Sequence, residues 1–223
     1  NTMTERLQHA DRLRRELMAD VAHELRTPLS VLQGRLEGLL DGVYPRDDRH
    51  IAEVLEDTHV LSRLIDDLRT LALTDAGTLP LQKESTDIVR LVREVVRSME
   101  AAAAQRSVTL NVKASADNIL LDIDPLRIRE VLTNLLSNAL RHSPAGAVVT
   151  VSVETIGEGV RVTVSDMGQG MPPEEVPRIF DRFYKGAESR GSGLGLTIAK
   201  GIVTAHGGEI GASSQPGKGT AVT

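Results

Sequence analysis

The sequence predicts two folds in succession, an antiparallel helical hairpin and then a two-layer α/β sandwich, so its class is α plus α/β. In the first third of the chain, apolar residues recur at alternating steps of three and four, which is the repeat of packed helices. After residue 83, shorter helical segments are mixed with runs that alternate apolar and polar residues, as strands do. We therefore expect the hairpin over residues 1–76, a hinge linker over 77–83 and the sandwich over 84–223.

The hairpin is expected to consist of two long helices. The first covers residues 3 to about 43, turn-forming residues follow over 41–47, and the second helix runs to about residue 76. One hairpin leaves half of its apolar surface exposed, whereas two copies paired in a four-helix bundle bury it. The pattern therefore predicts a homodimer.

The sandwich begins with a helix that Asp87 caps, and a later helix carries Pro125 at its favoured first position. Gly157 and Gly159 separate two alternating runs, which is typical of a β-hairpin. In chain order we expect helix 88–105, strands 108–112 and 118–123, helix 125–141, strands 148–154 and 160–165, helix 197–206, and strands 209–213 and 220–223.

Composition narrows the class of protein. The 223 residues carry a net charge of −5, which gives no indication of nucleic-acid binding, and they contain 0 cysteines, which excludes disulfides and thiolate metal sites. No apolar run approaches the ~20 residues that a membrane-spanning helix needs, and no signal peptide is present. Because the chain starts and stops abruptly, we expect it to be an excised soluble part of a longer protein.

The first helix carries a chemically distinctive segment. His23 and Thr27 are four residues apart and share one helix face, whereas Glu24 lies about 100° around the helix. Pro28 should bend the helix one turn beyond the histidine. A lone histidine in such a helix is usually a surface residue. Zinc is not expected, because Thr27 stands where a metalloprotease motif has its second histidine. Four other histidines lack ligand spacing and are expected at the surface: His9, His50, His59 and His206.

Three clusters stand out in the second domain. Asn134 and Asn138 are one helical turn apart and could share a hard cation, although such a pair can also be a solvated face. Asp166 opens an Asp-x-Gly-x-Gly segment directly after a predicted strand, which could be a turn or a site. Residues 191–196 form a glycine run that opens a helix and exposes backbone amides suited to phosphate. This run does not fit the dinucleotide fingerprint, and residues 217–220 do not fit the phosphate-loop motif.

The order of these motifs is more specific than any one of them. With the Phe-rich segment 178–185 between the second and third clusters, and with His-Glu-Leu-Arg-Thr-Pro at residues 23–28, the sequence resembles the catalytic core of a sensor histidine kinase of a two-component system. The resemblance covers essentially the whole chain. It implies a dimerisation and histidine-phosphotransfer domain followed by an ATP-binding domain.

The resemblance implies a role for each matching residue. His23 would accept the γ-phosphoryl group of ATP, Glu24 would take a ring proton, and Thr27 would help to dephosphorylate the partner regulator. Asn138 would be the main Mg²⁺ ligand and Asn134 a supporting one. The other implied nucleotide contacts are Arg141 at the phosphates, His142 beside adenine, Asp166 at the adenine amine, Lys185 near the γ-phosphate, and Gly168, Gly170, Gly193, Leu194 and Gly195 around the nucleotide and its lid.

The implied partner is the receiver domain of a response regulator, whose aspartate takes the phosphoryl group and which would dock near residues 29–36. We expect no nucleic-acid partner and no direct membrane contact, and we expect the fragment to be the cytoplasmic part of a membrane-anchored sensor. The alternative is a catalytically inactive or phosphatase-only dimeric scaffold of the same fold.

Two departures from the family pattern and one comparison bear on these roles. The lid at residues 186–191 is short, which makes the role of Lys185 less secure, and Val222 stands where an aromatic residue is usual. The ATPase fold is shared with gyrase and the heat-shock-90 chaperone, which carry a water-activating glutamate four residues before the metal-binding asparagine. That position is Asn134 here, which disfavours a hydrolase.

Overall fold

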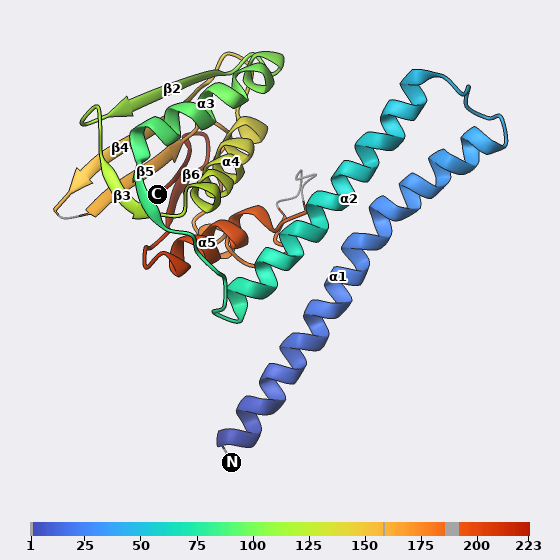
Figure 1. Cartoon of the computed structure of the whole chain (residues 1–223), viewed down its shortest axis with the longest axis horizontal. Coiled ribbons are helices and arrows are strands. Elements are labelled where there is room, and N and C mark those ends of the chain that lie inside the picture. The colour runs from blue at the N-terminus through green and yellow to red at the C-terminus, as the bar shows by residue number, and fades with distance from the viewer. Residues whose placement is uncertain (1, 158, 186–191) are drawn as a thin grey trace. The chain divides into compact units, whose positions relative to one another are not determined.

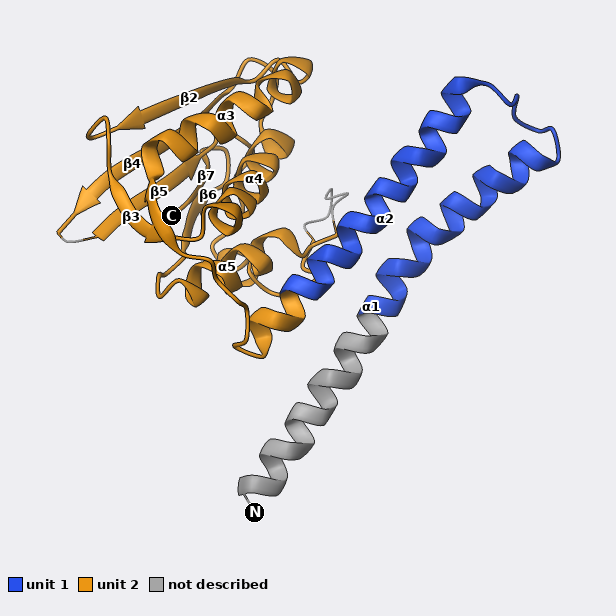
Figure 2. Cartoon of the chain, in the orientation of Figure 1, with its two compact units in different colours: residues 1–70 blue, residues 71–223 orange. Residues whose placement is uncertain are grey.

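The computed structural model describes residues 2–157, 159–185 and 192–223. Their contacts divide the chain into two compact units, residues 1–70 and 71–223 (Figure 2). In the described part of the chain, no helix has the length and apolar character needed to cross a membrane.

Two long helices form the predicted helical hairpin, which unit 1 contains except for the end of the second helix after residue 70. Helix α1 (Thr2–Leu40) runs through Pro28 without interruption, and α2 (Asp48–Asp75) follows after a short turn (Figure 1). Helix α1 ends three residues before the expected position 43, because the amide of Tyr44 turns back to donate to the carbonyl of Gly38 at 3.0 Å. Arg46 closes the helix by donating to the carbonyls of Leu39 and Leu40 at 3.0 and 3.1 Å.

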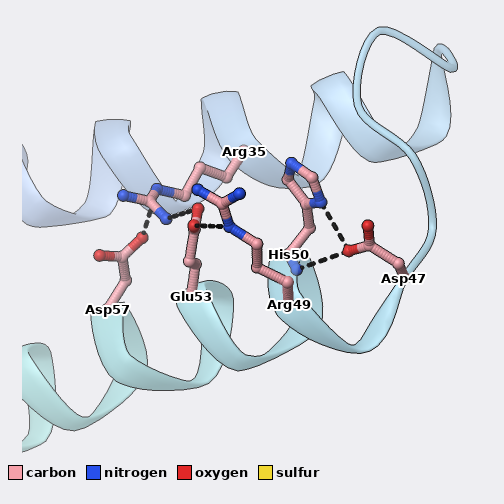
Figure 3. Close-up of polar contacts among 6 residues, drawn as sticks. All are labelled: Arg35, Asp47, Arg49, His50, Glu53 and Asp57. Atoms are coloured by element: carbon pink, nitrogen blue, oxygen red, sulfur yellow. Dashed lines mark hydrogen bonds and ion pairs between the residues drawn. The ribbon is translucent and has the colours of Figure 1, made fainter.

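Charged side chains link the two helices near the turn (Figure 3). The guanidinium of Arg35 on α1 lies 2.7 Å from Glu53 and 3.0 Å from Asp57, both on α2. Arg35 therefore joins two successive turns of α2 to a single position on α1. Because these charged groups are only partly buried, we expect them to fix the register of the two helices and to add little to the free energy of unfolding.

His50 was expected at the surface, and its side chain is partly buried by its neighbours. Its ring stacks on Tyr44 with 5.6 Å between centroids. Its Nδ1 lies 2.6 Å from Asp47, as Figure 3 shows. The hydrogen bonds from the His50 backbone amide and side chain lower the pKa of Asp47. A side chain at Gly38 would meet the Tyr44 ring at 2.5 Å, so Gly38 lets this ring cross α1.

Unit 2 contains the predicted two-layer α/β sandwich. Five strands form a sheet in the order β2-β4-β5-β7-β6, in which β2 and β4 are parallel and the other neighbours are antiparallel. A second sheet pairs β1 with β3. The strands are β1 (Glu84–Asp87), β2 (Thr109–Ala114), β3 (Leu120–Ile123), β4 (Val148–Ile156), β5 (Gly159–Ser165), β6 (Ala212–Gln215) and β7 (Gly219–Val222).

Three helices provide the second layer: α3 (Ile88–Gln105), α4 (Pro125–His142) and α5 (Gly195–Ala205) (Figure 1). Aliphatic side chains from these helices and from one face of β4 fill the core, as expected for a chain with few aromatic residues. The most completely buried are Val89, Val92 and Val95 on α3, Leu136 on α4, Val149, Val151 and Val153 on β4, and Ile198 and Ile202 on α5.

Local sequence signals predicted the starts of α3 and α4 correctly. Asp87 caps α3 by accepting from the amides of Val89 and Arg90, and Asp124 caps α4 in the same way. Two short elements were not predicted, β1 and the 3-10 turn η1 (Val176–Arg178), and β6 begins at Ala212 rather than at residue 209. Short strands such as β1 depend on a distant partner, so little in their own sequence marks them.

Candidate active site

Helix α4 carries the first cluster of candidate residues. Asn134 and Asn138 lie one turn apart and are partly buried, between the buried positions that pack α4 into the core. Arg141 and His142 occupy its last turn, where positive charge is favourable to the helix dipole. The helix therefore presents two amide oxygens and then two basic side chains along its length.

Asp166 lies directly after β5 and is supported by backbone groups. Its Oδ1 accepts from the amide of Gly168 at 2.8 Å and from the amide of Thr220 at 3.1 Å. Burial raises the pKa of Asp166, while these two hydrogen bonds and the charge of His142 oppose the shift. Because both of these amides donate to Oδ1, no hydrogen bond from the described residues occupies the other carboxylate oxygen, which can accept from a ligand amine.

Close packing explains why Gly168 and Gly170 of this segment are glycines. A side chain at Gly168 would overlap the carbonyl oxygen of His142, and one at Gly170 would overlap the carbonyl oxygen of Gln215. Gly170 also has a φ of +64°, which favours glycine. The Asp166 segment thus lies directly against the end of α4 on one side and against β6 on the other.

The glycine run, residues 191–196, contacts α4 at Asn134. The Nδ2 of Asn134 donates to the carbonyl of Gly195 at 3.3 Å, and Leu194 is completely buried. Gly193 has a φ of +73°, and a side chain there would meet the Phe183 backbone at 2.7 Å. Unit 2 therefore brings together the three clusters and the Phe-rich segment, although they are far apart in the sequence.

Lys185 is exposed at the end of the described part of the Phe-rich segment. The short lid expected at residues 186–191 lies outside the described residues. Phe183 has a φ of +57°, which is unusual for a bulky residue. Strained backbone of this kind is often found near functional sites.

The phosphoacceptor candidates lie on α1 in unit 1. His23 and Thr27 are exposed, and Glu24 is partly buried. The hydroxyl of Thr27 donates to the carbonyl oxygen of His23 at 3.5 Å, so this contact leaves the imidazole ring accessible.

Sequence reasoning missed two supporting residues. Thr220 fixes Asp166 from 54 residues away, and the only signal was the Gly-Lys-Gly-Thr segment, which had been compared with the phosphate-loop motif alone. His206 was expected at the surface but is partly buried: its Nδ1 donates to the carbonyl of Ile202 at 2.8 Å, and its Nε2 accepts from the amide of Asp124 at 3.0 Å. It joins the end of α5 to the start of α4.

Comparison with known proteins gives a consistent result. Residues 13–77 match the family model of the His Kinase A (phospho-acceptor) domain, and residues 123–223 match that of the histidine kinase-, DNA gyrase B- and HSP90-like ATPase. The signal transduction histidine-protein kinase BaeS of Escherichia coli K12 is 35% identical over 100% of this chain and 49% of its own sequence. The chain therefore spans about half the length of this curated relative.

Solved structures agree with these matches. The histidine kinase AdeS of Acinetobacter baumannii is 33% identical, with a TM-score of 0.77 over 90% of this chain and 95% of that chain. The histidine kinase ThkA, solved in complex with the response regulator protein TrrA, shares the fold at 23% identity, with a TM-score of 0.74 over 99% of this chain and 64% of that chain.

Proposed function

We propose a protein-histidine kinase activity from one premise: the chain belongs to the sensor histidine kinase family. The chain would bind ATP in unit 2, transfer its γ-phosphoryl group to His23 and pass this group to an aspartate of a response regulator. The observation that carries the proposal is the convergence of Asn134, Asp166 and Gly195 around α4 in unit 2, in a chain that also exposes His23.

Asp166 and His142 are the residues that we assign to the base of the nucleotide. The free carboxylate oxygen of Asp166 would accept a hydrogen bond from the adenine amine, since Oδ1 is already occupied by backbone amides. Gly168 allows the loop to approach His142 closely, so both residues border one place in unit 2. Arg141, Lys185 and the amides of the glycine run would face the phosphates.

The side-chain amide oxygens of Asn134 and Asn138 on α4 are suitable ligands for Mg²⁺. The Nδ2 of Asn134 donates to the carbonyl of Gly195, so the side-chain oxygen of Asn134 can face a cation. Oxygen is the ligand atom that Mg²⁺ prefers. Asn138 would be the main protein ligand and Asn134 would support it. A bound Mg²⁺ would neutralise phosphate charge during transfer.

At His23, the N–P bond would form as the bond between the γ-phosphorus and the departing ADP oxygen breaks. Glu24 would accept the proton of the other ring nitrogen and so keep the attacking nitrogen nucleophilic. Thr27 shares the helix face of His23 and would position water for dephosphorylation of the regulator. The chain would then act as kinase and as phosphatase.

Transfer is favoured over hydrolysis by the residues near the metal position. Asn134 cannot act as a base. The nearest carboxylate on α4, Glu130, forms an ion pair with Arg127 at 2.9 Å, which holds it to the preceding turn of the helix. A site of this kind suits a delivered nucleophile such as His23 better than an activated water.

The surface of unit 1 supports dimerisation. Large apolar side chains remain exposed on both helices of a single hairpin, and pairing with a second copy would bury them. They include Leu29, Val31, Leu36, Ile51, Leu55, Val60 and Ile65. Side chains of residues 29–36 that the pairing leaves exposed would meet the response regulator, and the whole would form the cytoplasmic part of a membrane-anchored sensor.

The test is incubation with Mg²⁺ and γ-labelled ATP, followed by acid and alkali treatment of the labelled protein. An acid-labile, alkali-stable label that is lost in His23→Ala and Asn138→Ala supports the proposal. His59→Ala, which removes an exposed histidine of α2, is the matched control and should keep the label. ADP binding without label would indicate a scaffold or a phosphatase, and steady phosphate release without label would indicate a hydrolase.

A further inference from the structure

Ser214 on β6 belongs to none of the motifs, yet its hydroxyl has three partners beside the proposed base site. The Oγ accepts from the amide of Met171 at 2.9 Å, donates to the carbonyl of Gly219 at 2.8 Å and lies 3.0 Å from the Oγ1 of Thr220. Ser214 and Thr220 are direct neighbours in the antiparallel pairing of β6 and β7.

The arrangement of protons in this cluster follows from chemistry. The Met171 amide can only donate and the Gly219 carbonyl can only accept, so the single hydroxyl proton of Ser214 goes to Gly219. The contact with Thr220 then requires the Thr220 hydroxyl to donate to Ser214. One serine hydroxyl therefore satisfies its full hydrogen-bonding capacity and gives the cluster a single arrangement.

This cluster holds the Asp166 segment at both of its ends. At the start, Asp166 donates its amide to the carbonyl of Thr220 at 2.9 Å and accepts from the Thr220 amide at 3.1 Å. Beyond its end, the amide of Met171 is bound by Ser214 itself. Between them Gly170 packs against the Gln215 backbone, so β6 and β7 form a template for the segment.

We propose that Ser214 is a positioning residue for base recognition: through Thr220 and Met171 it sets the direction of the free carboxylate oxygen of Asp166. The inference rests on the proposed function, because it assumes that Asp166 reads the amine of adenine. Ser214 does not touch the nucleotide in this scheme. Its removal should reduce discrimination between bases more than it reduces binding of the phosphates.

The test compares the affinities of ADP and inosine diphosphate by titration calorimetry. Inosine diphosphate keeps the ribose and both phosphates but replaces the amine with a carbonyl oxygen, which Asp166 would repel. Wild-type protein should prefer ADP. Ser214→Ala should reduce that preference by roughly 3- to 10-fold, about the energy of one neutral hydrogen bond, because Asp166 keeps its carboxylate and loses only part of its support. Ser214→Thr keeps the hydroxyl and should restore the preference.

Ser213→Ala removes a neighbouring exposed serine from the same strand and is the matched control. If Ser214→Ala does not fold, Ser214→Cys keeps the volume with a much weaker hydrogen-bonding group and should show the same reduction. An unchanged preference in folded Ser214→Ala or Ser214→Cys overturns the role of Ser214 alone. A wild-type protein that binds ADP and inosine diphosphate equally overturns the assignment of Asp166, and one that binds neither overturns the proposed function.

Discussion

Replacing Asp166 with asparagine should separate nucleotide recognition from stability. The carboxylate is partly buried, and burial raises its pKa, so the folded state binds this proton more tightly than the unfolded state does. The ionised group therefore opposes folding at neutral pH; this opposition declines once the pH falls below the folded pKa and is gone below the unfolded pKa. An asparagine oxygen could still accept from the amides of Gly168 and Thr220 without carrying charge.

We expect Asp166→Asn to unfold at pH 7 at a temperature equal to or above that of the wild type, and any excess should shrink as the pH is lowered into the acid range. Its affinity for ADP should fall by roughly 10- to 150-fold, since a charge-assisted hydrogen bond contributes about 1.5–3 kcal/mol. Thermal unfolding at several pH values and calorimetric titration measure the two effects. A variant that is less stable at pH 7, or that binds ADP as well as the wild type, refutes this account of Asp166.

Asp124→Asn is the matched control because its shift has the opposite sign. Burial raises the pKa of Asp124, but hydrogen bonds from the amides of Gln82, Arg127 and Leu126 outweigh it, and the net pKa is lowered. The ionised form therefore stabilises the fold above the unfolded pKa, and this contribution is lost as the pH falls through the folded pKa. Asp124→Asn should be less stable than the wild type at pH 7, and the difference should shrink in acid.

Three further substitutions test the supporting structure. Gly170→Ala should destabilise unit 2 by at least about 1 kcal/mol more than Gly217→Ala, since both glycines have positive φ but only Gly170 faces a backbone carbonyl; equal melting temperatures would contradict the packing argument. His206→Ala should lower the unfolding free energy by about 1–3 kcal/mol in urea titrations, because it leaves the buried Asp124 amide without its acceptor; a loss no larger than that of His59→Ala would exclude a structural role. Asn138→Ala should abolish the strengthening of ADP binding by Mg²⁺ while leaving binding in chelator unchanged, and a persistent Mg²⁺ effect in calorimetry would remove Asn138 from the metal site.

The features that the sequence predicted correctly are those with local causes. The caps at Asp87 and Asp124 lie next to the helices that they begin, and the apolar repeat of α1 and α2 is contained in each helix. The candidate residues of unit 2 were found from the order of their motifs. Their proximity depends on pairings over long separations, such as the 61 residues between Asn134 and Gly195.

The supporting residues were missed because their side chains are common and their partners are distant. A serine in a four-residue strand carries no signal until β6 is paired with β7 and the Asp166 segment lies over both. His206 looked like an isolated histidine because Asp124 lies 82 residues earlier in the chain. The steric roles of Gly168 and Gly170 likewise depend on carbonyl groups of His142 and Gln215, which only the folded chain brings near.

The proposed recognition residue Asp166 and the proposed nucleophile His23 differ in how they are held, and the difference follows from their tasks. Asp166 is bound by backbone amides, so a ligand meets a carboxylate that is already oriented and little ordering is needed on binding. His23 is exposed, and Thr27 contacts its carbonyl oxygen rather than its ring. A nucleophile that takes a phosphoryl group from a nucleotide and gives it to another protein has to be reached by both, and burial would block one of them. Substitutions near His23 should therefore change the two transfer rates independently, whereas substitutions near Asp166 should act through nucleotide binding.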